Sequence, residues 1–438
     1  MPWEIVMSDL SNDGETPTER LNAIVEQGLC IGCGLCQSVA GKNRVRVTRT
    51  SNGYLTPVVE GELDHATVDR IYAVCPGTRV EGLPARLVEN DTHHDNVWGP
   101  WRRIVRAWAA DPEVRFEGST GGALTALAAY LLASKRVDFI LHVKTSTSEP
   151  SFGEATLSFT EANVFEAAGS RYGPAAPLLD IGEVLDRNQP FAFISKPCDI
   201  GALRNYAQQD ERVDRLVRYW LTIVCGGYGT PRGTDAFFRR SGIDPEAVTG
   251  LRYRGRGCPG PTRVETADSV QEFHYIDYWG ADETTWTLPF RCKICPDGIG
   301  EAADIAAADT WVGGSPNRVD SGDDPGTNAL IARTRAGEEL IAAAAADGAL
   351  TLEYDIVPHT VSVYQPHQVN KKYAAWARNQ GLMDAGRMAP QTERLRIAEL
   401  ARELPEETNR FQRDGTRKRV EIGKASEPTP AAWKPSDR

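Results

Sequence analysis

FAFISKPCDIGALR (residues 191–204) is the stretch that decides the fold, because its character changes in the middle. FAFIS is a short apolar run that stops near Pro197, as buried strands do, and DIGALRNYAQQ then continues as a helix. RLVRYWLTIV (215–224) brings a second apolar run, which ends at Gly226. Strands that alternate with helices in this way predict an α/β fold.

The same alternation extends upstream. Between about residues 101 and 185 the sequence reads as strand IVRAWAA, helix GGALTALAAYLLAS and strand VDFILHV. Downstream, TERLRIAELARELPEE is helical in pattern, and KASEPTPAAWKPSDR is Pro-rich and polar, which predicts disorder. We therefore predict four parts: an N-terminal module (1–95), the N-terminal part of an α/β core (96–185), its C-terminal part (186–370), and a helical extension with a disordered tail (371–438).

Composition excludes several classes of protein. The 438 residues carry a net charge of −11, which argues against a nucleic-acid partner held through phosphate contacts. We find no apolar run of the roughly 18–20 residues that cross a bilayer. The first residues lack the basic and apolar regions of a secretory signal. We expect a cytoplasmic protein without a membrane or nucleic-acid partner.

A group of cysteines near the N-terminus points to an iron–sulfur cluster. Cys30, Cys33 and Cys36 have C-x2-C-x2-C spacing, and Cys75 follows in a Cys-Pro dipeptide. Such short loops let successive thiolates converge on one cluster, and a Pro after the last Cys belongs to the bacterial ferredoxin pattern. Zinc is the rival, although structural zinc sites usually pair two short Cys/His knuckles. We predict a 4Fe-4S cluster here.

A second cluster is predicted from four cysteines that lie further apart. Cys198 and Cys225 follow the two apolar strands, at the strand ends where α/β sheets build their sites. Cys292 and Cys295 form another C-x2-C. Cys258, in RGRGCPG, is left over: it is a small residue in a Gly-rich turn, a substitute ligand, or a group that faces the substrate.

Two patches of small residues could bind an anionic cofactor. In EGSTGGALTAL, Ser119 and Thr120 are good N-cap residues, and Gly121 and Gly122 allow close backbone approach at a helix start. In AAGSRYGPAAP, a second loop offers backbone donors, one cation and one aromatic ring, from Gly169, Ser170, Arg171 and Tyr172. Taken alone, either patch is more often structural. Beside two predicted clusters, both become plausible for FAD, because one-electron carriers need a two-electron partner.

These motifs together carry a family resemblance. STGGALTAL, GSRYGPAAP, SKPCDIGALR, VCGGYG, YRGRGCPG and RCKICPDGIGEAADIAAADTW, within residues 25–372, resemble the coenzyme F420 hydrogenase/dehydrogenase beta-subunit family in order and spacing. That family includes beta subunits that reduce the deazaflavin F420. It also includes FAD-containing reductases of chlorophyll metabolism, which act on 7-hydroxymethyl chlorophyll a or on the divinyl side chain of chlorophyll precursors.

The resemblance implies roles for particular residues. Ser119 to Gly122 and Gly169 to Tyr172 would help to hold FAD, and Lys196 would lie near the same cofactor. Asp309 and Trp311 occupy the family's Gly-Asp-x-Trp position, with Ala308 in place of the Gly. Cys258 stands where the family commonly has Trp, a departure in the predicted flavin loop. The expected fold class is thus a small N-terminal ferredoxin-like iron–sulfur module, an α/β flavin-binding core and a helical, partly disordered tail.

Two functions follow as expectations. The main one is a reductase in which electrons from a ferredoxin-like donor pass through two 4Fe-4S clusters to FAD and on to a small conjugated organic substrate. The alternative is an electron-transfer beta subunit of a larger dehydrogenase or hydrogenase that exchanges hydride with F420. A zinc-stabilised binding module is a third, minor reading. The sequence identifies no catalytic proton donor, and a homo-oligomer and a partner subunit both stay open.

The cysteine assignment makes a testable prediction. Cys292→Ser should remove about half of the iron and leave the first cluster intact, because it deletes one ligand of the second set only. Cys258→Ser should remove none. Iron and sulfide quantification after anaerobic purification checks both, and loss of iron from the Cys258 variant would show that the wrong fourth ligand was chosen.

Overall fold

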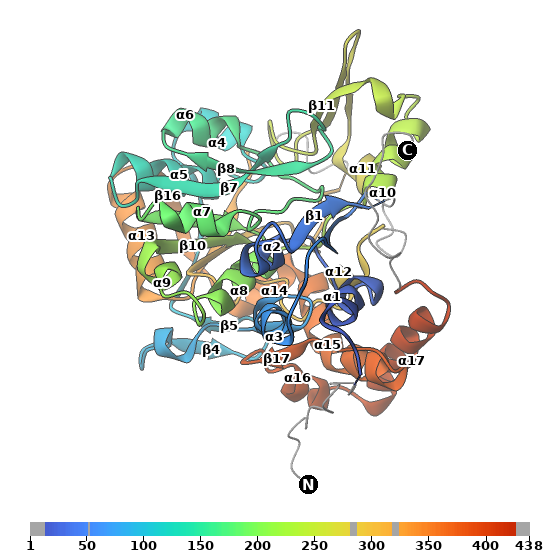
Figure 1. The fold of residues 1–438 in the computed structure, drawn as a ribbon. Coiled ribbons are helices and arrows are strands. Elements are labelled where there is room, and N and C mark those ends of the chain that lie inside the picture. The colour runs from blue at the N-terminus through green and yellow to red at the C-terminus, as the bar shows by residue number, and fades with distance from the viewer. Residues whose placement is uncertain (1–13, 51–52, 281–286, 318–323, 426–438) are drawn as a thin grey trace.

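An eight-stranded mixed sheet forms the centre of the computed structural model, which describes residues 14–50, 53–280, 287–317 and 324–425 (Figure 1). Its strands are, in spatial order, β16 (Leu350–Asp355), β6 (Arg103–Ala109), β15 (Asn328–Ala332), β14 (Ile305–Asp309), β10 (Val217–Ile223), β9 (Phe191–Ser195), β7 (Phe139–Thr145) and β8 (Gly153–Ser158). β14, β10, β9 and β7 are parallel to one another, and the outer strands pair antiparallel. The predicted mixing of helices and strands is confirmed.

The FAFISKPC stretch forms the predicted strand and helix. FAFIS is β9, and Pro197 begins helix α8 (Pro197–Tyr206) at a position where the missing N–H of proline costs nothing. Helix α9 (Arg212–Leu216) then leads into β10, which lies parallel to β9. Phe191, Ala192 and Phe193 are fully buried, as expected for a central parallel strand with both faces covered.

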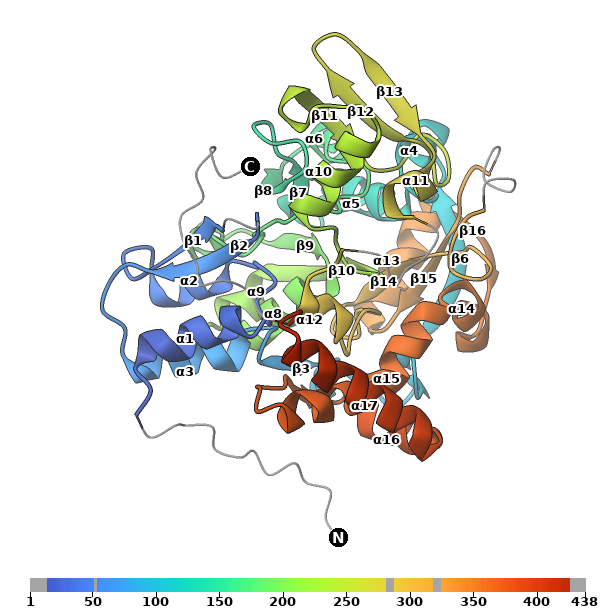
Figure 2. The ribbon, with the colours of Figure 1, turned by 90° about the vertical axis from the view of Figure 1, so that its right-hand side faces the viewer.

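Helices cover both faces of the sheet (Figure 2). Helices α5 (Ala123–Ala133) and α13 (Arg335–Ala346) pack on one face, where Leu127 and Ile341 meet Leu221 and Leu330. Helix α8 packs on the other face at one end, and α14 (Pro358–Tyr364) packs there at the other end. Short helices complete the connections: α4 (Pro112–Glu117), α6 (Glu161–Glu166) and α7 (Ile181–Asp186).

The N-terminal segment is built on the same core as the rest of the chain. It contains α1 (Pro17–Glu26), α2 (Leu35–Ala40), β1 (Val45–Arg49), β2 (Leu55–Val59), α3 (His65–Val74), β3 (Arg79–Glu81), η1 (Ala85–Leu87) and β4 (His93–Asp95). Leu21 and Ile71 share a hydrophobic cluster with Ile200 and Leu203 of α8. The boundary predicted at 95/96 falls inside a hairpin between β4 and β5 (Gly99–Trp101).

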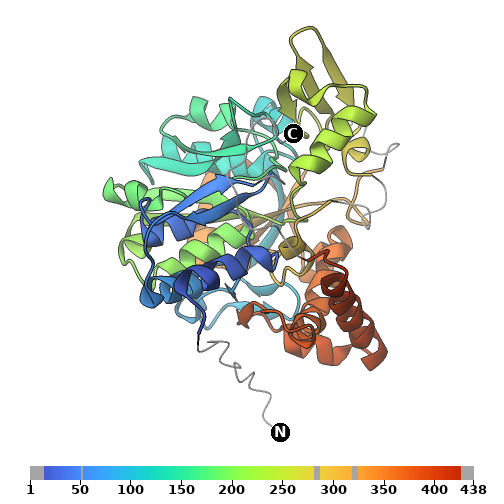
Figure 3. The same ribbon diagram turned by 45° about the vertical axis from the view of Figure 1, so that its right-hand side comes forward.

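The C-terminal extension is helical, as predicted, and packs against the rest of the chain. Helices α15 (Pro366–Asp384), α16 (Ile397–Glu403) and α17 (Glu406–Glu421) form the red bundle in Figure 3, and the predicted boundary at 370/371 falls inside α15. Strand β17 (Gln391–Glu393) pairs in parallel with β3, which joins the C-terminal extension to the N-terminal segment. The tail predicted to be disordered lies almost wholly outside the described residues. In the described part, no helix combines the length and apolarity needed to cross a membrane.

A long insertion separates β10 from β14. It holds α10 (Pro231–Arg240), η2 (Pro245–Ala247), α11 (Tyr275–Trp279), α12 (Phe290–Lys293), and a three-stranded sheet of β11 (Val248–Arg252), β12 (Thr262–Thr266) and β13 (Val270–Phe273). The small sheet projects from the end of the molecule opposite the C-terminal helices (Figure 3). This insertion carries Arg254, Cys258, Cys292 and Cys295, so its placement decides the site.

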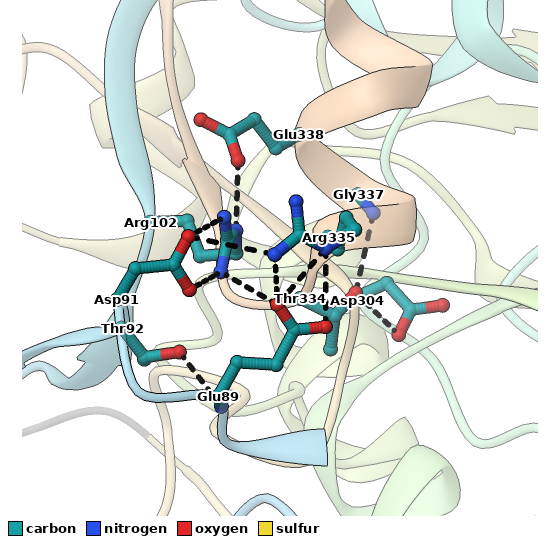
Figure 4. A network of polar contacts seen from close by, with 9 residues as sticks. All are labelled: Glu89, Asp91, Thr92, Arg102, Asp304, Thr334, Arg335, Gly337 and Glu338. Atoms are coloured by element: carbon teal, nitrogen blue, oxygen red, sulfur yellow. Dashed lines mark hydrogen bonds and ion pairs between the residues drawn. The ribbon is translucent and has the colours of Figure 1, made fainter.

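A network of charged side chains ties the loop before β4 to helix α13 (Figure 4). Arg102 donates to Asp91 at 2.6 Å and to Glu338 at 2.7 Å, and Arg335 pairs with Glu89. Thr334 caps α13 and also donates to the buried Asp304 at 3.0 Å. This network fixes the start of α13 and the entry to β14.

The buried His142 predicts a pH-dependent stability. It lies on β7, shares a hydrogen bond of 2.7 Å with Ser158, and has its pKa lowered to about 4 by burial and by Arg171. In the unfolded chain the imidazole takes up a proton near pH 6.5, so the folded state binds fewer protons between pH 6.5 and 4. As the pH is lowered from 6.5 to 4, the free energy of unfolding should therefore decrease, by roughly 3 kcal/mol at most.

Urea unfolding of wild type and His142→Gln between pH 4 and 7 measures this contribution as a difference between the two proteins. The wild type should lose its advantage as the pH falls. His94→Gln, which removes a histidine from the exposed strand β4, is the matched control. A wild-type advantage that stays constant with pH would refute the assignment.

Candidate functional site

Four N-terminal cysteines line one cavity. Cys30, Cys33 and Cys36 come from the loop before α2 and from α2 itself, and Cys75 ends α3. Gly32 and Gly77 donate backbone N–H groups to the sulfurs of Cys30 and Cys75, each at 3.4 Å. The remaining lining consists of apolar side chains, one glycine and two prolines: Leu21, Ile24, Ile31, Gly34, Leu35, Val47, Pro57, Ile71, Val74 and Pro76.

This loop needs glycine at one position in particular. Gly34 has a φ of 90°, and a Cβ there would lie 2.7 Å from the backbone N of Leu179. Glycine therefore lets the loop press against the segment before α7 while it turns two cysteines toward the cavity. Leu178 N–H donates to Cys33 O at 2.9 Å, which fixes this contact.

The second set of cysteines also lines one cavity, at the carboxyl ends of β9 and β10. Cys198 lies in the first turn of α8, Cys225 follows β10, and Cys292 and Cys295 come from α12 and the turn after it. The cavity differs from the first in its charged lining, which comprises Lys196, Arg291, Asp297 and Lys371. Both predicted four-cysteine sets are thus brought together in space, although their residues are far apart in the sequence.

Burial makes most of these thiols hard to ionise in the absence of a compensating charge. It raises the pKa of Cys33, Cys36 and Cys75 in the first set. In the second set it raises the pKa of Cys225 to about 12, where Cys292 adds to the effect and Lys371 opposes it. Thiolate is the form that binds a metal, so a bound cationic centre is what would stabilise it here.

The donor sets fit an iron–sulfur cluster better than a zinc ion. Zinc holds all its sulfurs about 2.3 Å from one point, whereas a cluster offers a separate iron atom to each thiolate. Within the described ranges, no three His, Cys, Asp or Glu side chains are grouped for a single metal ion. Four thiols around one cavity, with backbone N–H groups directed at sulfur, suit the larger group.

The two patches of small residues meet next to the carboxyl end of β14. Ser170 N–H donates to Ser119 Oγ at 2.7 Å, which joins the 119–122 loop to the 169–172 loop. Arg171 donates to the carbonyls of Ala168 and Ser170 within its own loop. The ring of Tyr172 packs on an aromatic cluster of the insertion, formed by Tyr253, Tyr275, Tyr278 and Trp279.

Arg254 is the buried centre of this site. Its side chain is only 3% exposed, pairs with Asp309 at 2.9 Å, and donates to Ser119 O at 2.6 Å and to the hydroxyl of Thr120. Its guanidinium lies 4.6 Å from the ring centre of Trp311 and 5.3 Å from that of Tyr275. Burial opposes the charge, but Asp309 raises the pKa of Arg254 above its ordinary value.

Two sequence-based readings need correction here. The sequence offers two interpretations of Arg252, Arg254 and Arg256 in LRYRGRG, a solvated turn or a loop that contacts an anionic cofactor or substrate; for the buried Arg254 the solvated turn is wrong. Ser119 and Thr120 do not cap α5: Gly122 is the N-cap, in a left-handed conformation with a φ of 68°. The hydroxyls contact Ser170 and Arg254 instead, because the loop must close on the insertion.

Lys196 and Cys258 lie on different sides of the site. Lys196 lines the second cysteine cavity and pairs with the fully buried Asp199 at 2.5 Å. Cys258 lines neither cavity. It is 2% exposed and lies near Arg254 and Trp311, and burial raises its pKa to about 12. The structure thus places Cys258 with the Arg254 site and away from both cysteine sets.

Neither of the two cavities includes residues 119–122 or 169–172. Their polar groups contact one another or Arg254. These contacts do not identify a binding place for a flavin dinucleotide, so FAD stays a prediction.

Sequence reasoning missed several residues that support the second cysteine set. Helix α15 supplies Gln368, which donates to Cys225 O at 2.8 Å, and Lys371, which donates to Gly226 O at 2.6 Å. Asp199 and Arg291 were missed as well, although each directly adjoins a predicted ligand in the sequence. For Asp199 and Arg291, adjacency to a predicted cysteine ligand was the available signal. For Gln368 and Lys371 of α15, the sequence contains no signal that links them to the cysteines.

Comparisons with known proteins agree with the resemblance. The family models described as coenzyme F420 hydrogenase/dehydrogenase beta subunit N-term and C terminus match residues 104–182 and 189–355, together more than half of the chain. A coenzyme F420-dependent sulfite reductase of Methanocaldococcus jannaschii is 23% identical over 342 residues, which are 73% of this chain and 47% of the relative. The chain therefore spans about half the length of that curated relative.

A solved structure shares the fold. A chain of the F420-reducing [NiFe] hydrogenase complex from Methanosarcina barkeri superimposes with a TM-score of 0.52 at 18% identity, covering 67% of this chain and 96% of the other. The first cysteine set lies outside the ranges that the two family models match.

Removal of the positive charge of Arg254 should strongly destabilise the folded protein. Arg254→Met should lower the free energy of unfolding by about 3 kcal/mol, because it leaves Asp309 without its partner beside a buried apolar side chain. Arg256→Met is the matched control, since the Arg256 side chain is 40% exposed and its ion pair to Glu117 is 3.4 Å long. Urea unfolding of both variants tests this, and equal stabilities would contradict a central role for Arg254.

Proposed function

The chain belongs to the coenzyme F420 hydrogenase/dehydrogenase beta-subunit family, and from this we propose that it is an electron-transfer subunit that exchanges hydride with F420. In this proposal two 4Fe-4S clusters, held by the two four-cysteine sets, connect the F420 site to a partner protein. Oxidoreductase activity is what its relatives share by name. F420 as substrate, the number of clusters and the partner subunit are parts of the proposal.

One observation carries the proposal: the second four-cysteine cavity and the Arg254 site lie at the carboxyl ends of neighbouring strands, and the first four-cysteine cavity adjoins the second. Ile31 lines both cavities, so the two sets are adjacent. Cys198 and Cys225 follow β9 and β10, and Asp309 ends β14, which is the next strand in the sheet. This arrangement supports a path for single electrons that starts at a two-electron site at the strand ends.

The residues of the chain have distinct tasks in this scheme. Arg254 would hold the 119–122 loop against Asp309 and keep the strand-end site in shape. Lys196, Arg291 and Lys371 would offset the negative charge of thiolates in the second set. The clusters would supply one-electron storage when bound, and backbone donors to sulfur tune such centres.

One observation favours the second candidate function, a stand-alone reductase. The N-terminal cysteine set lies outside the matched family ranges, which suits a stand-alone reductase with its own ferredoxin-like module. Such an enzyme would take electrons from a ferredoxin-like donor and pass them through FAD to a conjugated organic substrate. The comparisons support this less than the F420 subunit, because the names of the relatives refer to F420.

Anaerobic purification with quantification of iron, sulfide and flavin is the first test. We expect about eight irons per chain. The protein should then oxidise reduced F420 with a viologen dye as one-electron acceptor, followed by the absorbance of both. Cys292→Ser should lose the dye reduction, and Cys258→Ser should retain its full iron content as the matched control.

The outcomes separate the two functions. Electron uptake from reduced F420, but not from NADH or reduced ferredoxin, supports the F420 subunit. Uptake from reduced ferredoxin alone, with one FAD per chain, supports the reductase. About four irons, or zinc in place of iron, would contradict the two-cluster path.

A further inference from the structure

The two cysteine cavities meet at a shared wall of buried residues. Ile31 lines both cavities, and the hydroxyl of Tyr228 donates to the carbonyl of Ile31 at 3.5 Å. Tyr228 and Cys292 both line the second cavity. A residue of the second set's loop therefore contacts the CIGCGLC loop of the first.

Arg291, which lines the second cavity, contacts a residue that lines the first cavity. It stands next to Cys292 in α12, is 1% exposed, and donates from Nε and Nη2 to the carbonyl of Pro76 at 2.9 and 2.7 Å. Pro76 directly follows Cys75 of the first set. In the part of the chain that the structure describes, Arg291 forms no ion pair within 4.0 Å, and its guanidinium is held by the carbonyl of Pro76.

The charge of Arg291 acts on both sets. Its guanidinium donates to the carbonyl of the residue that follows Cys75, and Arg291 itself precedes Cys292 in the chain. A cation between two groups of thiolates reduces the repulsion between them, and at short range this effect is large where water is excluded.

The other cations at the second cavity do not have this position. Lys196 forms an ion pair with the buried Asp199 at 2.5 Å and does not hydrogen-bond to Pro76. Lys371 reaches Gly226 O from helix α15 and lines only the second cavity. Among the described residues that line this cavity, Arg291 is the cation that also hydrogen-bonds to a residue lining the first cavity, Pro76.

We infer that Arg291 is the positioning residue of cluster-to-cluster electron transfer, and this inference rests on the proposed two-cluster function. Its fork to Pro76 holds the two cysteine sets at a fixed separation. Its charge stabilises the more negative, reduced state of either cluster. If both sets hold clusters, Arg291 would position them for the transfer of a single electron and would take no part in the transfer itself.

The test is a redox titration of the anaerobically purified full chain, monitored by electron paramagnetic resonance. Arg291→Gln removes the charge but keeps an amide donor for Pro76. Both clusters should become roughly tenfold harder to reduce, which corresponds to about 59 mV for a one-electron couple. Arg291→Lys keeps the charge and should recover most of that shift.

Lys293→Gln is the matched control, because Lys293 flanks Cys292 on the other side and lines neither cavity. It should leave both midpoints unchanged. A shift confined to the Cys292 cluster, or no shift in Arg291→Gln, would overturn the inference, as would an equal effect of Lys293→Gln.

If Arg291→Gln loses iron, the electron paramagnetic resonance spectrum of the wild type provides a second test that needs no variant. In the fully reduced wild type, two clusters joined in this way should show spin–spin broadening. Two isolated signals would overturn the inference. Failure of the proposed function looks different: the wild type would lack two clusters or would not exchange electrons with F420.

Discussion

The site depends on the neutralisation of one buried cation, Arg254. A guanidinium taken out of water must be paired and hydrogen-bonded, and the partners of Arg254 come from widely separated segments. Asp309 ends β14, while Ser119 and Thr120 precede α5, and the arginine itself lies in the insertion between β10 and β14. Because these groups satisfy one another, the insertion is held over the strand ends, and the loop of Tyr172 closes on it.

The same insertion completes the second cysteine set. Cys198 and Cys225 follow adjacent parallel strands, so the sheet alone brings them to one edge. Cys292 and Cys295 arrive only because the chain returns from the small sheet to α12 before β14. Helix α15 then covers this edge through Gln368 and Lys371, which explains why the C-terminal extension packs on the core as an integral part of the structure.

The N-terminal segment and the core are joined through buried polar contacts as well as apolar packing. Arg291 reaches Pro76, Tyr228 reaches Ile31, and Leu178 reaches Cys33. Residues on both sides of the predicted boundary at 95/96 share one hydrophobic cluster, and packing between distant segments of this kind is not visible in composition. The described N-terminal segment is therefore positioned to exchange electrons with the core if both cysteine sets hold clusters.

The sequence by itself determined the features that depend on near neighbours. Apolar runs stopped by Pro and Gly predicted β9, β10 and the α/β fold, and the two-residue spacing of cysteines predicted which thiols share a loop. Only the tertiary structure decided which distant cysteines share a cavity in fact, that Arg254 is buried, and that Arg291 joins the two sets. Periodicity and loop spacing act over a few residues, whereas these contacts depend on strand order and on where a long insertion returns to the sheet.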